Sequence, residues 1–151
     1  MSRFAKFAAV GMAAAIALSI GPASAQDAKP EEILKMRQGI FQAVRMNFGP
    51  LGGVARGNTA FGPEAVERAE ALAALAKVAA QGFPAGSDNI PGSNTKPAAF
   101  QDASFGEKME AFGAEAAKLA QLGQAGDEAG FKAQIAAVGG SCKACHDSFR
   151  N

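Results

Sequence analysis

The sequence contains no tryptophan, no tyrosine, one histidine and two cysteines among its 151 residues. A structural zinc site takes four Cys or His ligands, and the sequence supplies three such residues, so this class of site is excluded. The aromatic part of the core has to be built from phenylalanine, of which there are 11. Basic and acidic residues are almost balanced, at 15 and 14, so no strong field is available to gather nucleic acid or anionic lipid.

The first 25 residues have the order of features found in a secretory signal peptide. Arg3 and Lys6 provide positive charge, residues 7–20 form an uncharged apolar stretch, and residues 23–25 read Ala-Ser-Ala, a small-x-small cleavage site. The apolar stretch is short for a membrane span, and an uncleaved membrane anchor is the alternative. The sequence thus predicts a cleaved signal peptide over residues 1–25 and export to the periplasm.

Cleavage leaves residues 26–151, a length that suits a single domain with one core. The removed segment holds two basic residues and no acidic ones, so the mature chain has a net charge of −1. We therefore expect it to bind neither nucleic acid nor, after cleavage, a membrane.

Both cysteines and the single histidine fall within one short motif, Cys142-Lys143-Ala144-Cys145-His146. This Cys-x-x-Cys-His spacing is the attachment signature of a c-type haem. The two thiols add across the two vinyl groups of the porphyrin, and the histidine reaches the iron as proximal ligand. A redox dithiol usually follows a strand in a βαβ unit, which this sequence lacks, and a disulfide between Cys142 and Cys145 on a helix would be strained. The motif predicts one covalently bound haem c.

Apolar residues recur at helical spacing in four stretches, and no stretch alternates in the manner of a strand. The first stretch begins at Pro30, the second at Pro63, the third at Pro97 or Asp102, and the last follows Asp127 as N-cap. A glycine- and proline-rich segment, residues 81–96, separates the second from the third and is the longest loop. The pattern predicts an all-α protein with a four-helix bundle fold.

Two glycine-containing stretches leave the helix boundaries open. Residues 49–53, Gly-Pro-Leu-Gly-Gly, should break or kink the first helix by local rules. Gly139 and Gly140 either let a porphyrin approach the backbone closely or end one helix, with Ser141 capping a new short one.

The last stretch has its apolar residues in steps of three and four, and both cysteines take part in this register. His146 lies four residues after Cys142 and therefore on the same helical face. We expect a haem held by this helix to lie against the interior of the bundle. The residues in register are Phe131, Ile135, Val138, Cys142, Cys145 and Phe149.

With these features the sequence resembles the cytochromes c′, the class II c-type cytochromes. Their haem motif lies near the C-terminus, as it does here within residues 138–150, and residues 29–38 resemble the start of their first helix. Phe48-Gly49 and Arg56-Gly57 also match in position, so that the resemblance covers residues 27–150. It implies an antiparallel four-helix bundle whose first helix runs through Gly49 and Pro50 with a bend.

The resemblance also implies roles for residues outside the motif. Arg37 and Gln38 match positions near the haem propionates, although a solvated surface charge is the alternative for Arg37. Asn94 matches a polar position at the haem edge. Arg150 matches a basic residue beside the proximal imidazole, and a cation at a helix C-terminus is favourable in any case.

The family position that faces the open side of the iron corresponds to Phe41, which has no lone pair for a metal. The resemblance therefore implies a five-coordinate, high-spin iron that carries single electrons, binds nitric oxide or carbon monoxide, or does both. The alternative is a six-coordinate, low-spin electron carrier with a methionine ligand. The candidates for this sixth ligand are Met36, Met46 and Met109. No distal acid–base pair is available, so we expect no enzymatic activity.

The family is often a homodimer through its first two helices. The small residues of the second predicted helix, including Ala69, Ala76 and Ala79, allow such a contact, but they can equally well thin the core. Redox proteins are the other partners that we expect.

Overall fold

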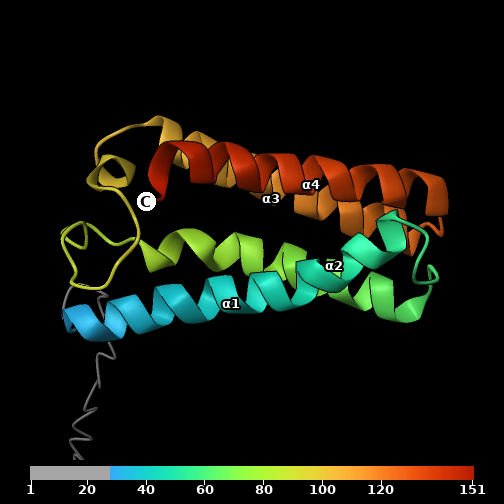
Figure 1. The fold of residues 1–151 in the computed structure, drawn as a ribbon, viewed down its shortest axis with the longest axis horizontal. Coiled ribbons are helices and arrows are strands. Elements are labelled where there is room, and N and C mark those ends of the chain that lie inside the picture. The colour runs from blue at the N-terminus through green and yellow to red at the C-terminus, as the bar shows by residue number, and fades with distance from the viewer. Residues whose placement is uncertain (1–27) are drawn as a thin grey trace, which may run out of the picture.

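The computed structural model describes residues 28–151 (Figure 1), so the predicted signal peptide lies outside the described residues. Four α-helices account for most of this part of the chain, and two short 3₁₀ turns flank the long loop. The helices are α1 (Pro30–Ala55), α2 (Pro63–Val78), α3 (Ser104–Gln124) and α4 (Glu128–Phe149), and the 3₁₀ turns are η2 (Ala79–Gly82) and η3 (Pro97–Phe100).

The helices form an antiparallel bundle in which α1 and α2 lie on one side and α3 and α4 on the other (Figure 1). The short connections between α1 and α2 and between α3 and α4 force the helices of each pair to run in opposite directions. Between α2 and α3 the chain crosses the bundle end in the long loop, which lies close to the C-terminus of α4. The predicted all-α four-helix bundle is confirmed.

The core is built from aliphatic side chains, alanine and phenylalanine. Phe131, Leu51, Leu72 and Leu119 are completely buried. The small residues considered for a subunit contact are instead inside the bundle, because Ala65, Ala69 and Ala76 of α2 and Ala79 of η2 are all buried. Their small side chains reduce the distance between α2 and the helices that pack against it.

Helix α1 continues through Gly49 and Pro50 to Ala55, so the break expected from local rules is wrong. Pro50 has no N–H, which leaves the carbonyl of Met46 without its helical donor. Arg68 of α2 donates from Nη1 to this carbonyl at 3.2 Å. The tertiary structure thus supplies the hydrogen bond that the proline removes.

Helix α4 also continues through its two glycines, so the alternative of a second helix capped by Ser141 is wrong. The Ser141 hydroxyl donates instead to the carbonyl of Val138, at 2.8 Å within the same helix. At the start of α4 the predicted cap is confirmed, because Asp127 accepts a hydrogen bond from the amide of Gly130 at 2.9 Å.

The long loop is attached to the end of α4 by backbone hydrogen bonds. The amide of Lys96 donates to the carbonyl of Phe149 at 2.8 Å, and that of Asn151 donates to the carbonyl of Asn94 at 2.9 Å. Residues 28–151 contain no β-strand beyond the isolated bridge between Thr95 and Arg150. This attachment holds the loop beside the Cys-x-x-Cys-His motif.

Candidate haem-binding site

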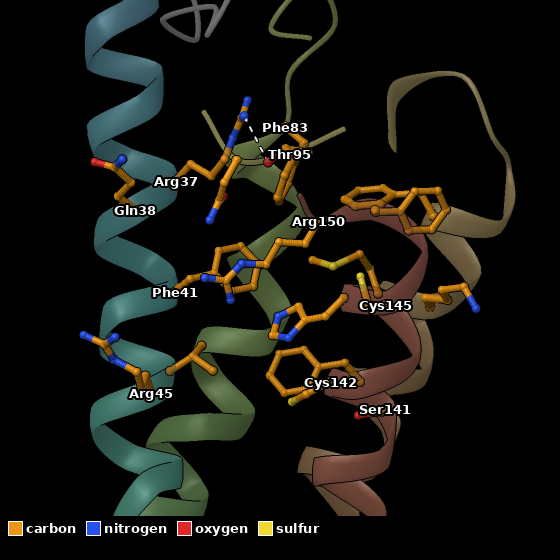
Figure 2. A pocket seen from close by; sticks show the side chains of 18 of the residues that line it. Arg37, Gln38, Phe41, Arg45, Phe83, Thr95, Ser141, Cys142, Cys145 and Arg150 are labelled. Atoms are coloured by element: carbon orange, nitrogen blue, oxygen red, sulfur yellow. Dashed lines mark hydrogen bonds between the residues drawn. The ribbon is translucent and has the colours of Figure 1, made fainter. Parts of the chain in front are cut away.

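A cavity of about 550 Å³ opens at the loop end of the bundle, between α1 and the C-terminal half of α4 (Figure 2). Its volume is within the range of about 300–1,000 Å³ that is usual for ligand sites. All eight residues predicted for the site line this one cavity. They are Arg37, Gln38 and Phe41 from α1, Asn94 from the loop, Cys142, Cys145 and His146 from α4, and Arg150 just after it.

The two cysteines are unbridged and half-buried. Burial raises the pKa of the Cys142 thiol above its ordinary value, and a hydrogen bond with Ser141 opposes the shift. Burial raises the pKa of Cys145 as well, against the charge of Lys108. Both thiols therefore stay protonated at neutral pH within the folded bundle.

Partial burial, followed by the charge of the neighbouring Arg150, lowers the pKa of His146 below its ordinary value. A lowered pKa favours the neutral imidazole, which is the form that binds a metal. Of the two glycines before the motif, Gly139 lines the cavity and Gly140 does not. A closer approach of a ligand to the backbone is therefore available at Gly139 alone.

The opposite wall of the cavity comes from α1, where Phe41 faces the helix that carries the motif (Figure 2). The two methionines of α1 point away from it: Met36 is 39% exposed, Met46 is 63% exposed, and neither lines the cavity. Met109 of α3 lines the cavity and is buried in the core, as predicted from its register.

Arg37 is the only buried charged residue among those described, with 4% of its surface exposed. Its guanidinium has five N–H groups, and all five point to neutral acceptors of the long loop. Nε donates to the Gly82 carbonyl at 2.7 Å, and Nη2 donates to the carbonyl and hydroxyl of Ser87 at 3.1 and 2.8 Å. Nη1 donates to the hydroxyls of Ser93 at 3.0 Å and Thr95 at 3.5 Å.

These contacts revise the alternatives predicted for Arg37. It is not a solvated surface charge, because burial both hides it and lowers the pKa of its guanidinium. Its contact with a haem propionate stays a prediction. A propionate would have to replace one of the loop acceptors, and the contact with Thr95 is the longest of the five and the most readily exchanged.

The other predicted polar residues are exposed at the mouth of the cavity. Gln38 and Asn94 are both exposed and line it, while the backbone carbonyl of Asn94 accepts the amide of Asn151. Figure 2 shows the side chain of Arg150 extending from α4 in the direction of α1.

Sequence reasoning missed several residues that line the cavity. Arg45 follows Phe41 by one helical turn, and Lys108 follows Phe105 by three residues, so helical spacing could have indicated both. Phe83 lies in the aperiodic loop, where no spacing rule applies. Its position is visible only in the structure.

The chemistry of the lining fits a haem. Two thiols and an imidazole lie on one wall and a phenylalanine on the opposite one, while the cations Arg37, Arg45, Lys108 and Arg150 line the cavity together with no carboxylate. Haem carries two propionates, which such cations complement. Within residues 28–151 no three His, Cys, Asp or Glu side chains gather as a set of metal ligands.

Comparison with known proteins identifies the family. The family model described as Cytochrome C′ matches residues 32–150. The chain belongs to the cytochrome c′ family. Cytochromes c′ are a standard example of the up-down-up-down four-helix bundle, in agreement with the fold described above.

Individual relatives cover most of the chain. Cytochrome c′ of Rubrivivax gelatinosus is 34% identical over 124 residues, which are 81% of this chain and 96% of the relative. Its crystal structure has a TM-score of 0.77 and covers 82% of this chain and 98% of that one. A nitric oxide complex of a mutant cytochrome c′ from Alcaligenes xylosoxidans is 32% identical, with a TM-score of 0.76 and coverages of 82% and 97%.

Membership of this family means that the protein binds haem c, and Cys142 and Cys145 provide the two thiols of the attachment motif. The cofactor predicted from the motif is thereby confirmed. None of the helices in the described part of the chain is long and apolar enough to cross a membrane.

Proposed function

We propose that this protein is an exported c-type haem protein that carries single electrons and binds nitric oxide or carbon monoxide at an open iron position. The observation that carries the proposal is the wall opposite His146, where α1 presents Phe41 and no metal ligand. Support for the gaseous ligand comes from the nitric oxide complex solved for a relative with the same fold.

Each side of the cavity has a distinct task in this proposal. Cys142 and Cys145 would hold the haem, and His146, whose neutral form is favoured, would bind the iron. A haem so held supplies an iron that exchanges one electron and has one coordination position left for a small ligand. Phe41 keeps this position apolar and narrow, which suits a neutral diatomic molecule better than an ion.

The alternative is a six-coordinate electron carrier with a methionine ligand. Met36 and Met46 are poor candidates, since both are exposed and neither lines the cavity. Met109 lines the cavity but is packed in the core on α3 rather than on the α1 wall. The lining therefore favours the open iron.

The absorption spectrum of the ferrous protein, recorded before and after addition of carbon monoxide, tests the proposal. An open position predicts a broad Soret band that sharpens when the gas is added. Narrow, split visible bands that do not respond to the gas would establish a sixth protein ligand and the alternative function. A protein without haem absorption would contradict the proposal and would leave a thiol–disulfide oxidoreductase as the function that the Cys-x-x-Cys motif indicates.

Export completes the proposal and has its own test. Residues 1–25 supply the signal, and covalent haem attachment takes place outside the cytoplasm, where the thiols of Cys142 and Cys145 would otherwise oxidise. Mass spectrometry of the protein from a periplasmic extract should give a chain that begins at Gln26 and carries one haem. A chain that retains residues 1–25 in the membrane fraction would point to the uncleaved anchor.

The assembly is proposed to be a homodimer through α1 and α2. The large apolar side chains that remain exposed in the described residues are Met36 at 39%, Met46 at 63% and Val78 at 36%, and all three lie on these two helices. Burial of these side chains against a second copy would remove their apolar surface from water, which supports a contact through the two helices that the resemblance implies.

A further inference from the structure

Phe83 lies at the centre of a group of phenylalanines that joins the two walls of the cavity. Its ring centroid is 5.8 Å from that of Phe41 on α1, 4.8 Å from that of Phe105 on α3 and 6.0 Å from that of Phe100 in η3. Phe105 in turn packs on Phe149 of α4 at 5.3 Å. We call these five residues the aromatic cluster.

Arg37 holds both the ring and the preceding backbone of Phe83 in place. The guanidinium carbon of Arg37 lies 4.6 Å from the centroid of the Phe83 ring. The Nε–H group of Arg37 donates a hydrogen bond to the carbonyl of Gly82, the residue before Phe83. A Cβ atom at Gly82 would come within 3.2 Å of the Arg37 Cα, so the loop begins directly against α1. Both the backbone before Phe83 and the face of its ring are therefore held by one side chain.

Phe41 lies one helical turn after Arg37. The same stretch of α1 therefore carries both the arginine that holds Phe83 and the phenylalanine on the wall opposite His146. The Phe41 ring meets the cavity on one side and the Phe83 ring on another, in an edge contact with an interplanar angle of 70°. Figure 2 shows Arg37, Phe83 and Phe41 grouped at this corner of the cavity. The Phe83 ring thus packs against the Phe41 ring beside the cavity.

We propose that Phe83 is a positioning residue for ligand binding, because its ring holds the Phe41 ring over the open iron position and so limits the rate at which a gas enters. The inference rests on the proposed function. In this proposal the loop of residues 83–96 controls ligand access although it supplies no ligand to the iron.

The first experiment compares Phe83→Leu with a matched control, Phe61→Leu. Phe61 is also a half-buried phenylalanine at the end of a loop, and its ring packs on Phe131 at 5.1 Å, but it does not line the haem cavity. Loss of one edge contact between aromatic rings should speed carbon monoxide association with the ferrous holoprotein by about two- to tenfold. The control should leave the rate within about 1.5-fold, and an unchanged or slower rate in Phe83→Leu overturns the proposal.

The second experiment asks whether Phe83 acts through Phe41. Phe83→Leu is combined with Phe41→Ala, and the association rate of carbon monoxide is measured for the four proteins of the cycle. The proposal predicts that Phe83→Leu has no further effect once the Phe41 ring is absent. An acceleration of equal size in both backgrounds would mean that Phe83 merely fills space, and would overturn the positioning role.

A third measurement does not depend on ligand binding. The protein is labelled with 4-fluorophenylalanine, and the ¹⁹F resonance of Phe41 is assigned with Phe41→Leu. Phe83→Leu should shift or narrow this resonance, and Phe61→Leu should leave it unchanged. If the wild-type protein fails to bind carbon monoxide, the proposed function fails while this measurement still decides whether Phe83 holds Phe41. If the gas binds and the resonance does not respond, only the positioning role fails.

Discussion

Phe41 is the residue whose substitution most directly separates the two candidate functions. Phe41→Ala should open the α1 wall of the cavity and raise the carbon monoxide association rate by about tenfold or more, since the phenyl ring proposed to limit access is removed. Stopped-flow mixing of the ferrous protein with the gas measures this rate. An unchanged rate would place Phe41 away from the path of the ligand.

Phe41→Met tests the same position in the opposite direction. A thioether at this site is able to bind the iron, so the variant should show the narrow visible bands of a low-spin haem. It should also bind carbon monoxide more slowly, because the gas then has to displace a ligand. Spectra that match those of the wild type would mean that this side chain does not reach the iron.

Arg37 is the residue on which we expect the stability of the loop to depend. Arg37→Lys keeps the charge but offers three N–H donors in place of five, which leaves loop acceptors unpaired in a buried position. We expect the free energy of unfolding to fall by about 2–4 kcal/mol, measured by urea denaturation of the holoprotein. Arg56→Lys, exposed at the C-terminal end of the same helix and outside the cavity, is the control and should cost less than about 0.5 kcal/mol. Equal losses in both would show that the loop contacts contribute little.

Among single residues, the haem motif could be predicted from the sequence, whereas the role of Arg37 could not. Cys142, Cys145 and His146 are recognisable because haem attachment requires their order and spacing. The role of Arg37 in the loop depends on acceptors that lie 45 to 58 positions away, so no local rule finds it. Phe83 is hidden for the same reason, since the structure alone brings it to Phe41.

At the scale of the helix, α1 illustrates how tertiary contacts override local propensity. Pro50 should cost a helix about 3 kcal/mol, yet α1 runs on for a further five residues. The side chain of Arg68 compensates part of this cost through the freed carbonyl of Met46. Of the break or kink that local rules gave for residues 49–53, the break is therefore wrong, whereas the resemblance to the family predicted a helix that continues with a bend.

This interpretation of Arg68 predicts a coupling with Pro50. Arg68→Leu should lower the free energy of unfolding by about 1 kcal/mol, because the Met46 carbonyl loses its donor. In the Pro50→Ala background the restored backbone N–H reaches the same carbonyl, so the loss should shrink to a few tenths of a kcal/mol. Glu64→Gln controls for the exposed ion pair between Arg68 and Glu64. Equal losses with and without Pro50 would contradict the interpretation.

At the scale of the whole molecule, the α1–α2 face predicts the oligomeric state. Met46→Lys places a charge at the most exposed large apolar side chain and should weaken a homodimer by tenfold or more in the dissociation constant, about 1.4 kcal/mol. Sedimentation equilibrium of the holoprotein measures this constant. Lys132→Met, on α4 and remote from that face, is the control. A wild-type protein that is monomeric at all concentrations would contradict the proposed assembly.

The fold class was predictable from the sequence because four amphipathic stretches with short turns leave few alternatives to a bundle. Phe131, Ile135 and Val138 are buried as their register predicts, and Asp127 caps α4. The path of the loop between η2 and η3 was not predictable, because it depends on contacts with Arg37 and with the end of α4 as well as on turns within the loop itself.

The backbone pairing of residues 94–96 with residues 149–151 has a kinetic consequence for maturation. Contacts between segments that are far apart in the chain form later in folding than the local contacts of helices, because their loop-closure entropy has to be overcome first. We therefore expect the helices that carry Phe41 and the cysteines to form before the loop pairs with the end of α4. Haem attached during this interval would meet accessible thiols, and pairing of the loop would then complete the cavity around the cofactor.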